Sequence, residues 1–529
     1  MGASEFDLLT VCELLPKPNK TASVNSSTLW FFPKHFGRSS VFRLKESYPE
    51  EMKRSLIPCC LLLFTVVAPF TFTVHAEDKS PDIVFIIVDD LNDWVGCLGG
   101  HPDAKSPNID ALAKSGMLFS QAYCNSPQCR PSRTSLMHGV YPFKTGTYFN
   151  AKDSKETNIK TPTIQQFFMD NGYRVASGGK VFHGHPGKIG DALLARPRDP
   201  KPPKGKDNFN AMRAPNDGYP LDVPDKEMGD YKVASWAIQQ WQEVTAKPLF
   251  MSVGFYRPHR PLQVPKPWFD AFPIKSIHRP AEPNGIDDWA DMPDFARKLA
   301  RSHAHKPMHK GLSDHEYIVE KNEWDATIRA YQASIAFVDR QIGRFIESLK
   351  KNPRNRETFV MLVSDHGWHL GEKKHWCKGA IWEQTTHIPF IVRGPGVKSN
   401  STCTQPASLI DVYPSLVDLA GLKVPDWLDG KSIKPQLKDP SKPRPPAISS
   451  YGESNTSIRT EHWRYIRYED GSEELYDHRV DPDEWTNLAN KQGHEKTKRK
   501  LAEMIPDDQH PGLKLQDWFD KFQPQQKVP

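Results

Sequence analysis

The sequence predicts an α/β protein with a large, mostly parallel central sheet and a smaller C-terminal unit. Two observations support the sheet: an apolar run from Asp82 that ends in two carboxylates, and further short apolar runs separated by helical stretches. The proline-rich stretch Lys438–Pro446 marks the start of the C-terminal unit. With 529 residues and 38% hydrophobic content, the chain is long enough for one large core and an appended unit.

The first predicted strand begins at Asp82 and reads Asp-Ile-Val-Phe-Ile-Ile-Val-Asp-Asp. Such a run is typical of a central parallel strand that is buried on both faces. Similar runs occur at Leu249–Gly254, Phe359–Ser364 and Pro389–Arg393. Strands that alternate with helices indicate a parallel sheet covered on both sides, with ligands bound at the carboxyl ends of the strands.

The stretch Ala326–Leu349 predicts an amphipathic helix between two of these strands. Its apolar side chains recur at helical spacing, at Ile328, Tyr331, Ile335, Val338, Ile342, Phe345 and Leu349. We expect this row of side chains to pack against the sheet.

The C-terminal unit is predicted to hold a small antiparallel sheet and a helix. Trp463–Tyr468 and Glu474–Tyr476 have the pattern of strands, and Lys496–Met504 has the pattern of a helix. The predicted organisation is a large domain at 77–437 and a C-terminal α+β subdomain at 438–529.

Two long surface loops are expected at Arg196–Pro215, which is rich in proline and lysine, and at Arg297–Lys310, which is rich in histidine and lysine. The simpler interpretation is that both are solvated linkers. Alternatively, they wall a cleft for an anionic substrate.

The segment 52–76 has the order of a secretory signal peptide. Lys53 and Arg54 precede an apolar run, which ends in the small-residue exit Val74-His75-Ala76. Residues 1–51 are then an over-extended start or an N-terminal extension, and the alternative is a membrane anchor. Cleavage is favoured, so we expect a periplasmic or extracellular protein without a stable membrane anchor.

The charge and cysteine content narrow the class of protein further. The 70 Lys and Arg against 64 Asp and Glu give a net charge of +6, too mild to indicate nucleic-acid binding. Beyond the signal segment the chain has five cysteines: Cys97, Cys124, Cys129, Cys377 and Cys403. An odd number in an exported protein leaves at least one cysteine unpaired or chemically altered.

Polar side chains follow two of the predicted strands and suggest a metal site. Asp89 and Asp90 end the first strand, and Asp365 and His366 follow Phe359–Ser364. A single aspartate at a strand end is more often a turn or cap former than a ligand. Three carboxylates on neighbouring strands, however, suit a hard divalent cation such as calcium or magnesium.

A short motif supplies the candidate nucleophile. The residues Cys129-Arg130-Pro131-Ser132-Arg133 fit the pattern C-x-P-S-R, and Thr134–Gly139 follow directly. This stretch resembles the type I, formylglycine-dependent sulfatase family, and the resemblance implies that Thr134–Gly139 continues the motif as a helix. The resemblance implies that Cys129 is oxidised to formylglycine and serves as nucleophile and metal ligand. It would lie near a helix N-terminus, which favours anions.

Further elements match the same family in the same order. Gly179-Lys180-Val181-Phe182-His183 resembles its G-K-x-x-H element, which implies that Lys180 binds the sulfate and that His183 is a base or orienting group. Tyr256-Arg257-Pro258-His259 implies a general acid at His259. Trp376-Cys377-Lys378 implies a second sulfate-binding lysine at Lys378, and Arg133 would also bind the sulfate and offset charge in the transition state.

The resemblance covers nearly the whole mature chain and implies an alkaline-phosphatase-like α/β sandwich that uses Ca²⁺. Many sulfatases have Asn where this chain has His366, but the iduronate-2-sulfatase-like branch, which this chain resembles most, also has His. An imidazole is a poor calcium ligand, so direct coordination by His366 is left open. The implied partners are a sulfated carbohydrate and a formylglycine-generating maturase.

Two other functions are compatible with these residues. A phosphodiesterase or phosphonate hydrolase of the same superfamily would act on a similar tetrahedral anion. A sulfated-glycan-binding protein without activity would result if Cys129 stayed unmodified. The sequence does not decide between two substrates, iduronate in a glycosaminoglycan and an algal polysaccharide.

Overall fold

The computed structural model describes residues 80–150, 159–184, 189–200, 218–283, 285, 287–302 and 312–522. The predicted signal peptide at 52–76, the stretch 1–51 and most of the loop Arg196–Pro215 lie outside these residues. Within the described ranges, every helix is too short or too polar to traverse a lipid bilayer. The domain boundary at 438 stays a prediction.

The central sheet has eight strands in the order β13-β2-β12-β9-β1-β7-β4-β5. Their bounds are β1 (Asp82–Asp89), β2 (Met117–Phe119), β4 (Arg174–Gly179), β5 (Ala192–Ala195), β7 (Leu249–Pro258), β9 (Thr358–Ser364), β12 (Phe390–Arg393) and β13 (Ser401–Cys403). β1 lies in the middle and pairs in parallel with both β7 and β9. Only β12 runs antiparallel to its neighbours, so the predicted mostly parallel sheet is confirmed.

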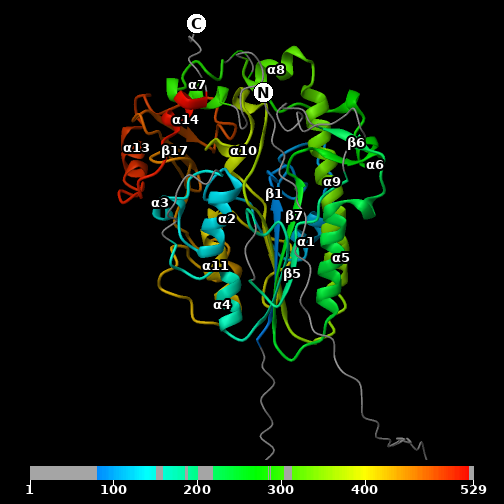
Figure 1. The fold of residues 1–529 in the computed structure, drawn as a ribbon. Coiled ribbons are helices and arrows are strands. Elements are labelled where there is room, and N and C mark those ends of the chain that lie inside the picture. Colours follow the sequence, from blue (N-terminus) through cyan, green and yellow to red (C-terminus); the bar gives the residue numbers. More distant parts are fainter. Residues whose placement is uncertain are drawn as a thin grey trace, which may run out of the picture. The chain divides into compact units, whose positions relative to one another are not determined.

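Helices cover both faces of this sheet (Figure 1). One face carries α1 (Pro107–Lys114), α5 (Gly229–Gln242) and α9 (Trp324–Ser348), and the other carries α2 (Cys129–His138), α4 (Ile164–Asp170) and α11 (Val412–Leu419). Alternate side chains of β1 enter the two cores, with Val84, Ile86 and Val88 on the α9 side and Ile83, Phe85 and Ile87 on the α2 side. This double burial explains the continuous apolar run in the sequence.

The C-terminal part holds a second sheet of four strands, antiparallel throughout. Its strands are β15 (Ala447–Ser450), β16 (Thr456–Arg459), β17 (Trp463–Arg467) and β18 (Glu473–Asp477), followed by α13 (Glu495–Ala502) and α14 (Leu515–Phe522). The predicted antiparallel sheet and helix are thereby confirmed. Ser449 and Ser450 bond to the backbone of Cys124 and Asn125, so the second sheet adjoins the segment that leads to Cys129.

Other short α-helices and strands lie between these elements. They are α3 (Pro142–Thr145), α6 (Lys266–Asp270), α7 (Asp294–Arg301), α8 (Asp314–Glu320), α10 (Glu383–Thr386), α12 (Lys434–Lys438), β3 (Ala122–Tyr123), β6 (Tyr219–Leu221), β8 (Gln263–Pro265), β10 (His369–Leu370), β11 (Trp376–Cys377) and β14 (Ala407–Ser408).

The prediction of a loop at Arg297–Lys310 is wrong for its first part, because helix α7 extends to Arg301. Phe295, Ala296, Leu299 and Ala300 are buried along one face of this helix. The basic residues on its other face hid this apolar stripe in the sequence. Residues 303–311 lie outside the described ranges.

Candidate active site

Three buried aspartates meet where β1 and β9 end. Val88 pairs with Ser364 in the parallel register, so Asp89, Asp90 and Asp365 emerge at the same edge of the sheet. All three are fully buried. Asp90 has a left-handed backbone, with φ of 62°, and its N–H donates to Oδ1 of Asp365 at 3.0 Å. Because of this turn, the carboxylates of Asp89 and Asp90 point in different directions.

A hydroxyl from α9 holds the other side of this turn. The Tyr331 hydroxyl donates to the carbonyl oxygen of Asp90 at 2.7 Å and accepts the N–H of Asn92 at 3.0 Å. The Ser364 hydroxyl accepts the N–H of Leu91 at 3.0 Å. The backbone groups of the turn are therefore satisfied although water is excluded.

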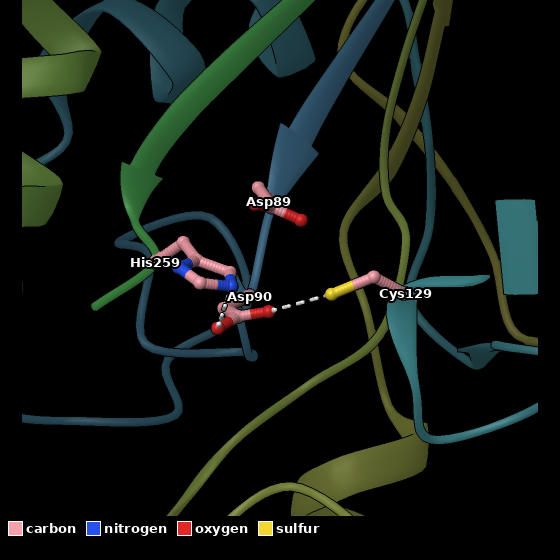
Figure 2. Close-up of side chains that lie close together, drawn as sticks. All are labelled: Asp89, Asp90, Cys129 and His259. Atoms are coloured by element: carbon pink, nitrogen blue, oxygen red, sulfur yellow. Dashed lines mark hydrogen bonds and ion pairs between the residues drawn. The ribbon is translucent and has the colours of Figure 1, made fainter. Parts of the chain in front are cut away.

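Cys129 is the first residue of α2, and its side chain is fully buried. Its Sγ lies 3.0 Å from Nζ of Lys378, 3.3 Å from Nε2 of His366 and 3.7 Å from Oδ1 of Asp90. Figure 2 shows the thiol pointing at Asp90 from the opposite side of the site to His259. Burial raises the pKa of the Cys129 thiol, but Lys180 and Lys378 outweigh burial and lower that pKa overall.

His366 directs one ring nitrogen into the same cluster. Its Nδ1 lies 3.0 Å from the carbonyl oxygen of Gly367, which orients the ring. Nε2 is 3.2 Å from Oδ1 of Asp90 and 3.7 Å from Oδ2 of Asp365. Burial lowers the pKa of His366, but Asp365, Cys129 and Asp90 outweigh burial and raise that pKa to about 9, so the ring must lose a proton before Nε2 can bind a metal ion.

The donor atoms suit a divalent cation. Ligand atoms of Asp90, Cys129, Asp365 and His366 lie within 4.8 Å of one another, as do those of Asp89, Asp90, Cys129 and His259. Burial raises the pKa of Asp90 to about 7, against the opposing effect of Lys378. A cation bound here would offset the cost of burying these carboxylates, so the residues fit a hard metal ion with oxygen ligands.

Arg133 contacts the aspartates. Its Nε donates to Asp365 at 2.8 Å, its Nη2 donates to Asp89 at 2.9 Å, and its Nη1 donates to the carbonyl oxygens of Lys180 and Val181. The guanidinium is 1% exposed. Arg133 therefore fixes the positions of two carboxylates, whereas the sequence suggested contact with the sulfate.

The two predicted lysines approach the cluster from different elements. Lys180 follows β4 and pairs with Asp89, with Nζ 3.8 Å from Sγ of Cys129. Gly179 allows this approach: a Cβ there would lie 2.0 Å from the carbonyl oxygen of Gly254. Lys378 follows β11 and lies 2.8 and 3.1 Å from the two carboxylate oxygens of Asp90.

His259 lies just beyond the end of β7, with Nε2 3.8 Å from Oδ2 of Asp90 (Figure 2). Its Nδ1 lies 2.6 Å from the carbonyl oxygen of Arg260, which orients the ring. The buried carboxylate of Asp230 accepts the N–H groups of Tyr256 and Arg257, each at 2.8 Å, and so fixes the segment that carries His259.

His183 is exposed, and no hydrogen bond joins it to Cys129. Loss of water around part of its ring, together with the Lys180 cation, lowers its pKa to about 4. The structure thus brings Asp89, Asp90, Cys129, Asp365, His366, Lys180, Lys378 and His259 into one cluster, braced by Arg133, and leaves His183 at its margin.

A family model described as Sulfatase matches residues 81–422. The chain belongs to the sulfatase family. It is therefore a hydrolase of sulfate esters. A second model, described as N-sulphoglucosamine sulphohydrolase, C-terminal, matches residues 371–510, which include Lys378 and the second sheet.

Named relatives of this sulfatase span most of its length. A sulfatase of Formosa agariphila is 34% identical over 437 residues, covering 79% of this chain and 84% of the relative. The human iduronate 2-sulfatase is 29% identical over 433 residues, covering 71% of this chain and 76% of the relative.

Solved structures share the fold. A 2-O GAG sulfatase matches with a TM-score of 0.64 and 23% identity, covering 84% of this chain and 93% of that one. A phosphonate monoester hydrolase of Agrobacterium radiobacter matches with a TM-score of 0.64 and 22% identity, covering 80% and 94%. The predicted fold class is confirmed.

Sequence reasoning missed three residues that shape the site of this sulfatase. Tyr331 was placed correctly on the buried face of a helix, but only as an apolar contact. Asn92 and Asp230 carried no motif. Their common feature is a polar group at a buried position, and a single sequence does not reveal it.

Proposed function

We propose that this sulfatase is exported, binds Ca²⁺ and removes sulfate from a sulfated sugar through a formylglycine made from Cys129. The observation that carries the proposal is the position of Cys129, at the start of α2 and facing buried carboxylates and two lysines. A negatively charged sulfate ester would meet Lys180, Lys378 and a metal ion at the same point.

Asp89, Asp90 and Asp365 would hold the ion, with the modified Cys129 and His366 facing it. When bound, Ca²⁺ supplies a charge that polarises the sulfate oxygens. Arg133 is a positioning residue here, since its hydrogen bonds run to Asp89 and Asp365.

Conversion of Cys129 replaces the thiol sulfur with an aldehyde oxygen and removes two hydrogens, so a maturase must supply the oxidant. The hydrated aldehyde supplies two hydroxyls, one to attack sulfur and one to expel sulfate afterwards. Lys180 and Lys378 bind the sulfate oxygens and offset the developing charge. Burial, Lys180 and Lys378 lower the pKa of His259. A bound sulfate ester would offset the charge of the two lysines, so that Nε2 takes up the proton that His259 then donates to the departing sugar oxygen. His183, at the margin of the cluster, would accept a proton from the nucleophile once substrate is bound.

The sugar class rests on the relatives. One relative is named an iduronate 2-sulfatase and one structural neighbour is a 2-O GAG sulfatase, so a sulfated uronate or amino sugar of a polysaccharide is the proposed substrate. An algal polysaccharide is the alternative source of this sulfated sugar. The segment 52–76 supports export to the periplasm or the medium.

The mass of the tryptic peptide that contains Cys129 tests the nucleophile. We expect a loss of about 18 Da in protein from the native host or co-expressed with a maturase. Cys129→Ala is expected to abolish sulfate release, whereas Cys124→Ala, at a buried cysteine five positions earlier, retains it. An unmodified and active Cys129 overturns the mechanism.

Paired substrates separate this proposal from its rivals. We expect sulfate esters to be turned over faster than phosphonate monoesters or phosphodiesters of the same alcohol. The reverse preference identifies a phosphonate hydrolase or phosphodiesterase. Binding of sulfated glycan without turnover, with Cys129 unmodified, identifies a binding protein.

A further inference from the structure

Arg196 lies beside the candidate active site, although no motif includes it. It directly follows β5 at the carboxyl end of that strand. Its guanidinium carbon is 4.1 Å from the centroid of the Tyr256 ring. The same ring lies 5.2 Å from Nζ of Lys180 and 4.7 Å from the ring of His259. One aromatic side chain therefore separates Arg196 from two residues of the cluster.

Arg196 differs from Arg133 and Arg257 in its charge environment. Arg133 is buried and paired with Asp89 and Asp365, and Arg257 is buried and paired with Asp199. Arg196 is exposed, and no carboxylate among the described residues pairs with it. Its positive charge is thus available to a ligand.

The position of the Arg196 guanidinium over the Tyr256 ring leaves its hydrogen-bond donors available to a ligand. A guanidinium that lies over a ring uses its flat face, while its five N–H groups point outward in its own plane. That edge binds carboxylate or sulfate oxygens in pairs. The Tyr256 ring limits the freedom of the side chain, which reduces the entropy lost on binding.

We propose that Arg196 is a specificity-determining residue that binds a second anionic group, a carboxylate or a further sulfate, on the sugar whose sulfate ester is hydrolysed. This inference rests on the proposed function and deepens it, because it requires a substrate with two negative charges. Lys180 and Lys378 bind the sulfate that is released, and Arg196 binds the group that remains.

Arg196→Gln removes the charge at an exposed position and is expected to fold normally. Arg198→Gln is the matched control, since Arg198 is exposed on the same segment two residues later. Each variant and the matured wild type are assayed on three sugars with the same scissile sulfate. One carries no other charge, one carries a carboxylate and one carries a second sulfate.

We expect Arg196→Gln to lower kcat/KM about 10- to 100-fold, mainly through KM, on one or both doubly charged sugars. The sugar that is affected identifies the group bound. Turnover of the singly charged sugar and all activities of Arg198→Gln should stay within about twofold of wild type. Arg196→Lys should be intermediate, because it keeps the charge and loses the planar edge.

Equal losses on all three sugars, or no loss on any, overturn the role of Arg196 while leaving the proposed function intact. A matured wild type that hydrolyses no sulfate ester overturns the proposed function and the inference with it. The midpoint of thermal unfolding, measured for each variant, identifies a loss that comes from misfolding.

Discussion

The hydroxyl of Tyr331 lies 2.7 Å from the carbonyl oxygen of Asp90 and links helix α9 to the candidate metal site. Asp90 adopts a left-handed backbone that costs about 1–3 kcal/mol for a residue other than glycine. Its carbonyl group is held by Tyr331 and its N–H group by Asp365. These two bonds stabilise the strained turn from both sides.

Tyr331→Phe should weaken this turn. Losing the hydroxyl leaves the buried Asn92 N–H without its acceptor, so we expect unfolding free energy to fall by about 1–3 kcal/mol. The Ca²⁺ concentration for half-maximal activity should rise about tenfold. Tyr468→Phe, which removes a buried hydroxyl bonded to Glu474 in the C-terminal part, should lower stability without changing the calcium requirement. An unchanged calcium requirement in Tyr331→Phe contradicts the positioning role.

Arg133→Lys should cost both stability and activity. A lysine cannot bridge Asp89 and Asp365 with separate N–H groups, and breaking a buried ion pair costs about 3–5 kcal/mol. Denaturant unfolding and sulfate release measure the two effects. As a control, Arg444→Lys disturbs the buried pair with Asp411 and should lower stability only. Activity of Arg133→Lys within twofold of wild type would show that the bridge is dispensable.

His259→Gln should discriminate between leaving groups. We expect kcat on a sugar sulfate to fall about 10²- to 10⁴-fold, because the sugar alkoxide needs a proton. The loss on 4-nitrophenyl sulfate should be much smaller, since nitrophenolate departs without one. His278→Gln, at an exposed histidine paired with Asp103, should leave both rates unchanged. Equal losses on the two esters argue against a general acid at His259.

Removal of divalent metal should inactivate and destabilise the protein. Chelation is expected to lower the midpoint of thermal unfolding, and added Ca²⁺ should restore both the midpoint and sulfate release. Asp365→Asn should lose this calcium-dependent shift. Asp418→Asn, at an aspartate paired with Lys434, should keep it. A midpoint that does not respond to chelator in the wild type rules out a structural role for the ion.

The sequence predicts those parts of the site that depend on strand order. Because β1 and β9 are apolar runs buried on both faces, their ends could be located, and parallel pairing brings Asp89 and Asp365 together. By contrast, β4 contains Gly178 and Gly179 and β5 is short, so neither strand was recognised. The strands next to Lys180 and Arg196 were therefore absent from the prediction.

The sequence also did not predict the direction in which long side chains point. Arg133 was expected at the sulfate and contacts aspartates, because a motif gives residue types and not the path of a long side chain. Tyr331 was predicted at a buried helical position. The apolar pattern predicts that its ring is buried, but it does not predict which group its hydroxyl bonds to. The position of Arg196 depends on its contact with Tyr256, which no spacing encodes.

The central position of β1 also bears on how the chain folds as it emerges from the ribosome or from an export channel. Asp82 bonds to a residue 167 positions later, and Val88 bonds to one 276 positions later. In either case β1 emerges well before its partner β9. During this time its apolar run has no partner on that edge and can pair with other chains. Chaperones that cover β1 until residue 364 has emerged should therefore raise the yield of folded protein.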